Sequence, residues 1–356
     1  MDGFNGVYKN KRVLITGHTG FKGSWLSIWL HELGAQVIGY AMDPYTSKDN
    51  FVLSKIGDKI QDIRGDINDY NTLLEVFQKY KPEIVFHLAA QPLVRYSYEY
   101  PVETFQTNVM GTINVLECIK NCRETKIGIM ITTDKVYENK EQIWGYKEND
   151  PLGGFDPYSA SKACAEIAIQ SWRNSFFPSN KFSIHGKAIA SVRAGNVIGG
   201  GDWAKDRIIP DIVRAVEDSN PIQIRNPKAI RPWQFVLDAL NGYLLLGQKL
   251  MESPSQYSEA WNFGPEHSSI VDVYHLVSEF VKYYRKGEIQ IAEEQNKPHE
   301  AGLLLLEINK AVMKLGWKPK FSFSQALKYT AAWYLMYPNS DVYNLCVSQI
   351  EEFITQ

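Results

Sequence analysis

Short apolar runs alternate with amphipathic stretches over the first part of the chain. Residues 12–16 form an apolar run that ends at Gly17, and residues 36–40 form a second run. Between them, residues 21–33 carry apolar side chains at helical spacing and stop before Gly34. This pattern predicts a strand, a helix and a second strand, which together make one βαβ unit.

The same alternation continues further along the chain. Helices are predicted at 71–80, 107–121 and 159–176, and strands at 84–88, 127–132 and 188–193. Because these strands are apolar almost throughout, they suit a parallel sheet that helices cover on both faces. The sequence therefore predicts an α/β fold with a doubly wound parallel sheet.

The composition of the sequence changes after Gly201, where Trp, Pro and Arg become frequent. Short helices are predicted at 210–217 and 237–246, and isolated strand-like pieces at 222–225 and 261–263. We predict a first domain over residues 1–200 and a smaller mixed α/β lobe over residues 201–356. Some segments of the second lobe are expected to return to the first domain.

Composition and charge narrow the classes of partner. The 356 residues carry 38 basic and 40 acidic groups, a net charge of −2, so nucleic acid is not an expected partner. No apolar run approaches the ~20 residues that span a bilayer, so no membrane association is expected. The 4 cysteines and 7 histidines lack metal-ligand spacing, which predicts no metal site and reduced thiols in a cytoplasmic protein.

Three glycines follow the first predicted strand. Gly17, Gly20 and Gly23 form a GxxGxxG pattern with Phe21 inside it, directly before the first helix. Glycines in this strand–turn–helix context allow the backbone to approach a pyrophosphate at the helix N-terminus. The pattern predicts that residues 1–200 form a Rossmann-type dinucleotide-binding domain.

The ends of the next strands supply further cofactor candidates. Asp43 follows the second strand, where a carboxylate binds ribose hydroxyls and repels a 2′-phosphate, so NAD is favoured over NADP. Since Asp43 precedes Pro44, a turn-forming role is the alternative. Other candidates lie where an open α/β sheet binds its ligand, although the alanines also suit simple packing: Asp66, Ile67, Leu88, Ala89, Ala90 and Gln91.

Tyr158 and Lys162 are four residues apart at a predicted helix start, and so they share one helix face. A neighbouring cation stabilises a phenolate, and we expect Lys162 to lower the pKa of Tyr158 from its usual value of about 10. A tyrosine with a lowered pKa is a base for an alcohol proton. The spacing also arises by chance, and the glycine loop upstream is what favours chemistry.

These motifs, in this order, resemble the extended short-chain dehydrogenases/reductases that act on nucleotide sugars. The resemblance rests on Gly17–Gly23, Asp66, Leu88–Ala90, Thr132–Asp134 and the Tyr158/Lys162 pair. It implies that Thr133 hydrogen-bonds the sugar 4-hydroxyl, that Tyr158 takes its proton, and that Lys162 holds the nicotinamide ribose. Hydride then passes from C4 to NAD.

The segment Thr133-Asp134-Lys135-Val136-Tyr137 is similar to the Thr-Asp-Glu-Val-Tyr of nucleotide-sugar 4,6-dehydratases, with Lys135 in place of Glu. Together with residues 193–203, it resembles the branch that acts on CDP-glucose. The resemblance implies that Asp134 protonates the departing C6 hydroxyl. On this resemblance, Lys135 is expected to act at C5, either as a base with a lowered pKa or as a cation that stabilises the enolate. A solvated pair at a strand end is the alternative.

Both parts of the chain supply candidates for binding the substrate. Asn196 matches the family asparagine at the sugar-nucleotide diphosphate, and Arg207 and Arg231 are suited to phosphate oxygens. For Arg207, a surface ion pair with Asp202 or Asp206 is the alternative. Gln91 and Arg95 are candidates for the sugar pocket or, alternatively, exposed polar residues. The choice of CDP over other nucleotides rests on the resemblance alone.

The favoured activity is therefore conversion of CDP-glucose to CDP-4-keto-6-deoxyglucose. A nucleotide-sugar 4-epimerase, a dehydratase for another nucleotide sugar and a non-catalytic NAD-sensing protein are the alternatives. The family implies a homodimer or higher homo-oligomer, paired through helices at 107–121 and 159–176. It also implies a pathway that makes deoxysugars for the O-antigen of a bacterial lipopolysaccharide.

Overall fold

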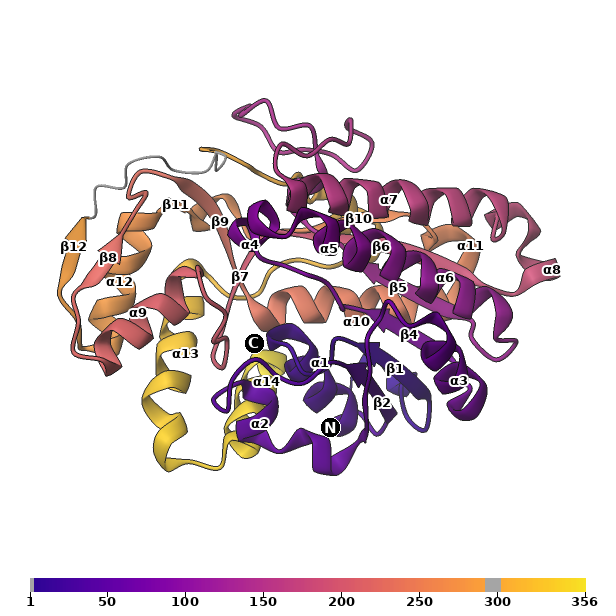
Figure 1. The fold of residues 1–356 in the computed structure, drawn as a ribbon, viewed down its shortest axis with the longest axis horizontal. Coiled ribbons are helices and arrows are strands. Elements are labelled where there is room, and N and C mark those ends of the chain that lie inside the picture. The colour runs from indigo at the N-terminus through magenta and orange to yellow at the C-terminus, as the bar shows by residue number, and fades with distance from the viewer. Residues whose placement is uncertain (1–2, 292–301) are drawn as a thin grey trace.

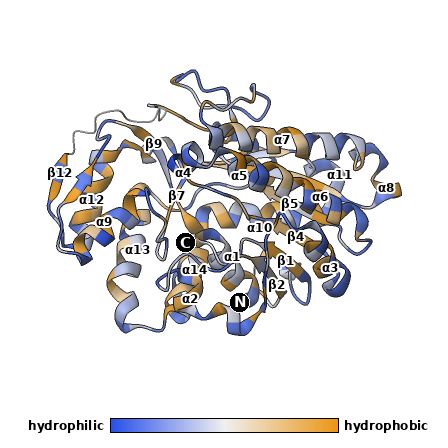
Figure 2. Ribbon diagram, in the orientation of Figure 1, coloured by the Kyte–Doolittle hydropathy of each residue, from blue (hydrophilic) through white to orange (hydrophobic). Residues whose placement is uncertain are grey.

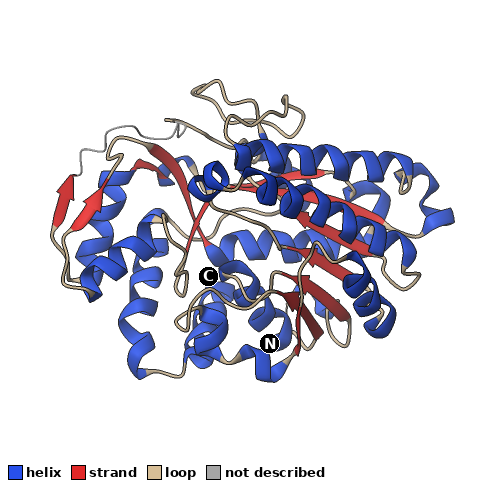
Figure 3. Cartoon of the chain, in the orientation of Figure 1, coloured by secondary structure: helices blue, strands red, loops and turns tan. Residues whose placement is uncertain are grey.

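The computed structural model describes residues 3–291 and 302–356. Its core is a sheet of seven parallel strands in the order β10-β6-β5-β4-β1-β2-β3 (Figures 1 and 3). These strands are β1 (Arg12–Thr16), β2 (Gln36–Ala41), β3 (Gln61–Arg64), β4 (Ile84–His87), β5 (Ile127–Ile131), β6 (Ala188–Ala194) and β10 (Ala260–Phe263). The order reverses between β1 and β4, which confirms the predicted doubly wound sheet.

Helices cover both faces of this sheet. One face packs against α3 (Tyr70–Tyr80), α6 (Gly111–Asn121) and α7 (Pro157–Ser175), and the other against α1 (Phe21–Glu32), α10 (Val236–Glu252) and α14 (Val342–Thr355). In β1, Val13 and Ile15 belong to the core on the α1 side, whereas Leu14 belongs to the core on the α3 side. Burial on both faces explains why the inner strands are largely apolar (Figure 2), whereas the edge strand β3 is polar and mostly exposed.

Two smaller sheets form the β-structure of a second lobe, which begins with β7, before the boundary expected at residue 201. One has the order β11-β9-β7 and the other pairs β12 with β8. Their strands are β7 (Asn196–Ile198), β8 (Ile222–Ile224), β9 (Ile230–Phe235), β11 (Ile270–Asp272) and β12 (Ile289–Ile291). The lobe's longer helices are α9 (Ile208–Glu217), α12 (Val273–Tyr284) and α13 (Phe323–Met336). In Figure 1 this lobe lies to the left of the large sheet.

The chain returns from the second lobe to the large sheet. Residues 261–263, which the sequence suggests as an isolated strand, lie in β10, and β10 pairs in parallel with β6. The helix expected at 237–246 extends over Val236–Glu252 and packs under β5 and β6. The short apolar pattern of β10 carries no signal of its distant partner, since pairing between strands is a tertiary property.

Two predicted helices differ from the structure at their starts. The helix expected at 107–121 consists of a π-helical turn at Gln106–Met110 and α6, and a further short helix, α5 (Pro101–Phe105), precedes them. Helix α7 begins at Pro157, because the Asp156 side chain accepts the Ser159 N–H as an N-cap and proline suits the first helical position. The remaining short helices are α2 (Asn50–Ser54), α4 (Val94–Glu99), α8 (Phe182–His185) and α11 (Pro254–Tyr257).

No helix in the described ranges is long and apolar enough to cross a membrane.

Candidate active site

A cavity of about 460 Å³ opens at the carboxyl edge of the large sheet. This volume lies within the range of about 300–1,000 Å³ for small-molecule sites. The residue that directly follows each of six strands lines the cavity: Gly17, Met42, Gly65, Leu88, Thr132 and Gly195. An open α/β sheet binds its ligands at this edge, where the strand order reverses.

The glycine loop forms one wall of the cavity. Gly17 has a φ of +75°, and a Cβ there would lie 2.7 Å from the Ala89 backbone nitrogen. A Cβ on Gly23 would lie 2.1 Å from the Gly17 carbonyl oxygen, so the loop and helix α1 pack without room for a side chain. Gly20, Phe21 and Gly23 also line the cavity. This N-terminus of α1 has the form that a pyrophosphate group requires.

Asp43 lies at the mouth of the cavity, and its side chain is 88% exposed. Its carboxylate is 3.6 Å from the Arg64 Nε at the end of β3. Arg64 also donates to Asp62 at 2.8 Å. The guanidinium of Arg64 therefore lies beside the predicted ribose-binding carboxylate. The sequence near Asp43 does not reveal this neighbour, because Arg64 comes from the adjacent strand.

The other predicted cofactor residues divide into two groups. Ile67, Leu88, Ala89 and Ala90 line the cavity. Asp66 is exposed outside it, with a side chain that accepts the Asn68 N–H. Gln91, proposed for both cofactor and sugar, is buried outside the cavity, where its amide donates to Thr104 at 2.8 Å and to the Leu93 carbonyl. Its polar groups are used to hold the loop after β4.

Tyr158 and Lys162 reach the cavity from the first turns of α7, as their spacing predicts. Burial raises the pKa of Tyr158 to about 12, and the hydroxyl of Thr133 and the charge of Arg207 oppose the rise. Lys162 donates to the Ile131 carbonyl at 3.1 Å, and burial lowers its pKa to about 8. The expectation that Lys162 lowers the pKa of Tyr158 is wrong for this structure, since desolvation dominates and Arg207 is the opposing cation.

The turn after β5 carries the other predicted catalytic groups. Thr133 donates to the Asp134 Oδ1 at 3.0 Å and accepts the Lys135 N–H. Asp134 is 2% exposed, and its Oδ2 has no hydrogen-bond partner among the described residues. Burial raises the pKa of this carboxyl, against the effects of Lys135, Thr133 and Arg231. Lys135 lines the cavity with its Nζ 6.0 Å from the Tyr158 ring centroid.

Four predicted substrate residues line the cavity, three from the second lobe and one, Arg95, from α4. They are Asn196, Arg207, Arg231 and Arg95. Arg207 forms an ion pair with Asp202 at 2.8 Å, the alternative that the sequence left open, and it lines the cavity as well. Arg231 donates to the carbonyls of Ile230 and Gly302, and Arg95 lies 3.8 Å from Asp206.

Lys22 is a cavity residue that the sequence reasoning did not identify. Its Nζ lies 3.4 Å from the Tyr243 hydroxyl of α10. Burial lowers its pKa to about 7, and Arg207 and Lys162 act in the same direction. The available signal was its position, because Lys22 is the charged side chain within the glycine loop itself.

Within the described residues, no group of histidines, cysteines and carboxylates has the arrangement of a metal site. The cavity instead joins a glycine loop to a tyrosine, two lysines with lowered pKa values and a buried carboxyl group. A phenol aimed at a dinucleotide site suits alcohol oxidation, and an acid nearby suits elimination from the product. The fold and the cavity define a dinucleotide-dependent enzyme with an acid–base site.

Comparison with known proteins identifies the family. Residues 14–330 match the family model described as GDP-mannose 4,6 dehydratase, and the chain belongs to this family. It is 49% identical to a CDP-glucose 4,6-dehydratase of Salmonella typhimurium, over 92% of this chain and 91% of that protein.

Solved structures agree on the fold. A dTDP-glucose 4,6-dehydratase from Bacillus anthracis, in complex with NAD, superposes with a TM-score of 0.74 at 20% identity, covering 94% of this chain and 99% of that one. An epimerase from Methanothermobacter thermautotrophicus gives a TM-score of 0.78 at 24% identity and covers 96% of each chain. Dehydratases and epimerases thus share this architecture, and the groups in the cavity must distinguish them.

We expect Gly23→Ala to weaken dinucleotide binding on the order of tenfold or more, because the added Cβ would clash with the Gly17 carbonyl and displace the loop at a cost of about 1–3 kcal/mol. Isothermal titration of the purified protein measures the affinity. Gly3→Ala is the matched control, since its Cβ would meet nothing closer than Leu33 at 3.4 Å. Equal affinities for Gly23→Ala and the unmodified protein would show that the loop does not form the binding surface.

Proposed function

We propose that the protein is an NAD-dependent lyase that converts CDP-D-glucose to CDP-4-keto-6-deoxy-D-glucose. The observation that carries the proposal is the turn Thr133–Lys135, which brings a buried acid and a lysine into the same cavity as Tyr158 and Lys162. An epimerase has no need of an acid and a base for elimination. The identity of 49% with a CDP-glucose 4,6-dehydratase supports the same reading.

NAD fits the half of the cavity that the glycine loop lines. When bound, it would accept the hydride of sugar C4 and return it to C6, so no external reductant is consumed. Gly17, Gly20 and Gly23 would accommodate the pyrophosphate, and Ala89 and Ala90 leave room for ribose. Asp43 would bind the adenosine ribose, and Lys162 the nicotinamide ribose.

Tyr158 takes the proton of the C4 hydroxyl in this proposal, while Thr133 holds the same hydroxyl. Burial makes the phenolate costly, since it raises the pKa of Tyr158 to about 12. The groups that oppose this cost are the Thr133 hydroxyl and the fixed charge of Arg207. Proton transfer therefore depends on these two residues as well as on Tyr158.

Asp134 is the proposed acid for water loss at C6. Its burial raises the pKa of the carboxyl, which favours the protonated form that an acid requires. Its Oδ2 has no partner among the described residues, so the proton it carries is available to a leaving hydroxyl. The Thr133 hydroxyl holds the other oxygen and sets the orientation of the group.

Lys135 is the proposed group at C5. It follows Asp134 on the same turn, its Nζ is 6.0 Å from the Tyr158 ring centroid, and it lines the cavity. Once C4 is a ketone, the C5 proton is acidic, and an amine takes it or an ammonium stabilises the enolate. The two roles differ in the protonation state of Lys135 before the step.

The sugar nucleotide would bind with its diphosphate toward the second lobe. Arg207 and Arg231 supply guanidinium groups, and Asn196 supplies an amide. Arg207 retains its charge, because Asp202 raises the pKa of its guanidinium against the effect of burial. A guanidinium that is already paired and ordered binds phosphate oxygens with little further loss of side-chain freedom.

The proposal includes the setting of the enzyme. We expect a homodimer paired through α5–α7, where large apolar side chains are exposed at Val102, Phe105, Met110 and Ile167. We expect a cytoplasmic enzyme that serves deoxysugar synthesis for a bacterial O-antigen, and the free thiols of Cys118, Cys122 and Cys346 suit a reducing compartment.

The direct test is to incubate the purified protein and NAD with CDP-, dTDP-, UDP- and GDP-glucose. We expect CDP-glucose to give a 4-keto product that has lost one water, measured by mass spectrometry. An isomer of unchanged mass would favour an epimerase. A 4-keto product from another nucleotide sugar would show that the enzyme selects a base other than cytosine. Binding of NAD without turnover would favour a non-catalytic NAD sensor.

The Asp43–Arg64 pair should control the choice of dinucleotide. Asp43→Ala removes the ribose-binding carboxylate and releases Arg64, so we expect weaker binding of NAD and stronger binding of NADP in calorimetric titrations. The double variant Asp43→Ala, Arg64→Ala should lose the gain for NADP, because the released cation is absent. Tighter binding of NADP than NAD by the unmodified protein would overturn the assignment.

Tyr158→Phe should lower kcat by about 10²–10⁴-fold, because the group that accepts the C4 proton is lost. The affinity for CDP-glucose should change little, since the ring is retained. Initial-rate kinetics and titration of the substrate measure the two effects. Tyr100→Phe, at an exposed tyrosine outside the cavity, is the control. Near-native turnover by Tyr158→Phe would remove this residue from the chemistry.

Lys135→Met and Asp134→Asn should stop the reaction at different points. Lys135→Met should oxidise C4 but stall before elimination, so reduced cofactor accumulates in the near-ultraviolet spectrum and little solvent deuterium enters C5. Asp134→Asn should still exchange deuterium at C5, because the base survives, while loss of water slows. If Lys135→Met exchanges C5 and forms product at the native rate, Lys135 is a bystander.

A further inference from the structure

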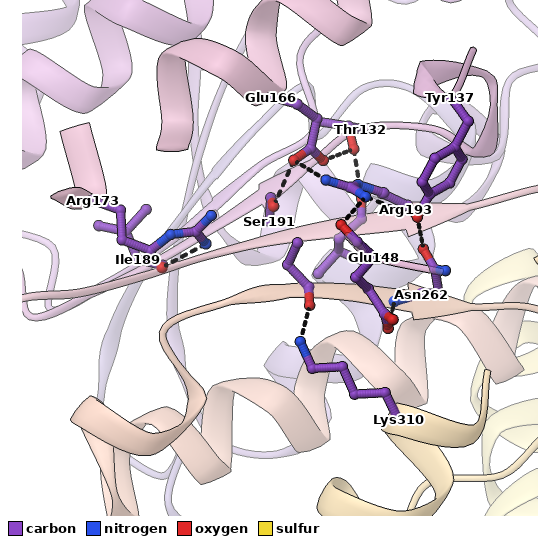
Figure 4. A network of polar contacts seen from close by, with 12 residues as sticks. Thr132, Tyr137, Glu148, Glu166, Arg173, Ile189, Ser191, Arg193, Asn262 and Lys310 are labelled. Carbon is purple, nitrogen blue, oxygen red and sulfur yellow. Dashed lines mark hydrogen bonds and ion pairs between the residues drawn. The ribbon is translucent and has the colours of Figure 1, made fainter. Parts of the chain in front are cut away.

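A buried ion pair lies beneath the proposed catalytic turn. Glu166 is on α7, four residues after Lys162, and Arg193 is near the end of β6. The Arg193 Nη2 is 2.9 Å from the Glu166 Oε2, and the two side chains are 4% and 1% exposed. Figure 4 shows the pair at the centre of a polar network. Neither residue lines the cavity.

Glu166 holds the first flank of the turn. The Thr132 hydroxyl donates to the Glu166 Oε1 at 2.5 Å, and Thr132 directly precedes Thr133. The second carboxylate oxygen accepts from Ser191 at 2.8 Å as well as from Arg193. Both oxygens are therefore used, and the position of Thr132 is tied to helix α7, which carries Tyr158 and Lys162.

Arg193 holds the second flank. Its Nη1 donates to the Tyr137 hydroxyl at 2.8 Å and to the Glu148 carbonyl at 2.9 Å. The Tyr137 hydroxyl in turn donates to the Asn262 Oδ1 at 2.7 Å. The guanidinium carbon also lies 4.9 Å from the Tyr137 ring centroid. Glu166 therefore holds Thr132, and Arg193 holds Tyr137, so one ion pair fixes both ends of the segment 132–137.

Both members of the pair are charged. Arg193 and the hydroxyls of Thr132 and Ser191 lower the pKa of Glu166 against the effect of burial. Glu166 and Tyr137 raise the pKa of Arg193. Burying two charges costs so much desolvation energy that such a pair is weak evidence for stability alone, and holding a specific geometry is its better-supported use. The segment that it holds here contains three proposed catalytic groups.

We propose that Glu166 and Arg193 are positioning residues, which hold the turn Thr133–Lys135 at the correct place opposite Tyr158 and Lys162. The role in turnover rests on the proposed function, whereas the restraint on the turn does not. The planar fork of Arg193 is essential because Nη2 binds the acid while Nη1 binds the tyrosine. A lysine at this position would keep the charge and lose one of the two connections.

The test compares Arg193→Lys with two milder variants, Thr132→Val and Tyr137→Phe, which each release one flank. Misplacement by about 1 Å costs on the order of 10²-fold in rate, so Arg193→Lys should lower kcat 10- to 100-fold, with the KM for CDP-glucose nearly unchanged. Each flank variant should lower kcat by a smaller factor. Amide hydrogen exchange of the NAD-loaded protein should rise in residues 133–136 in all three.

Lys187→Met is the matched control. Lys187 directly precedes β6, at the opposite end of the strand from Arg193, and its buried ammonium donates to the carbonyls of Cys122 and Thr125. It should lower the thermal unfolding midpoint without a selective loss of kcat or faster exchange in residues 133–136. A general loss of stability would act equally in both sets of variants.

Native exchange of residues 133–136 in Arg193→Lys, or a kcat loss no larger than that of Lys187→Met at equal loss of stability, would overturn the proposal. If Arg193→Lys does not fold, Thr132→Val and Tyr137→Phe decide the matter by the same criteria. Failure of the proposed function is a separate result, since it would appear as absence of a 4-keto product from the unmodified protein. The exchange measurement would then still confirm or refute the restraint on the turn.

Discussion

The common direction of the large sheet's strands is the constraint on which the rest of the structure depends. Because the strands are parallel, their carboxyl ends meet at one edge, and the order reverses between β1 and β4. Segments far apart in the chain, such as the loop at Gly17 and the turn at Thr133, therefore line one cavity. Residues of the second lobe, among them Asn196, Arg207 and Arg231, line the far side of this cavity.

Burial then determines the electrostatics of the site. It raises the pKa of Tyr158 and Asp134 and lowers that of Lys22 and Lys162, so each shift favours the neutral form. Arg207 remains charged beside them. The pKa values of the two lysines are thereby brought close to neutral pH, where a group exchanges protons with a substrate most readily.

The glycine loop, the tyrosine–lysine pair and the turn after β5 could be found from the sequence, since each is a local pattern at a strand end or helix start. The effect of Lys162 on the pKa of Tyr158 could not be judged in this way, because the sequence does not report how strongly Tyr158 is desolvated. Gln91 and Asp66 illustrate the same limit. Both follow the expected strands, yet Gln91 binds its own loop and Asp66 lies outside the cavity.

The sequence by itself determined the class of fold, the location of the dinucleotide loop and the chemistry available at residues 133–135, because hydrophobic period and short motifs are local properties. Only the tertiary structure decided that Arg64 faces Asp43, that Lys22 enters the cavity, and that Glu166 meets Arg193 beneath the turn. These contacts join residues on different strands and helices. Their distances depend on strand order and helix packing, which no local pattern contains.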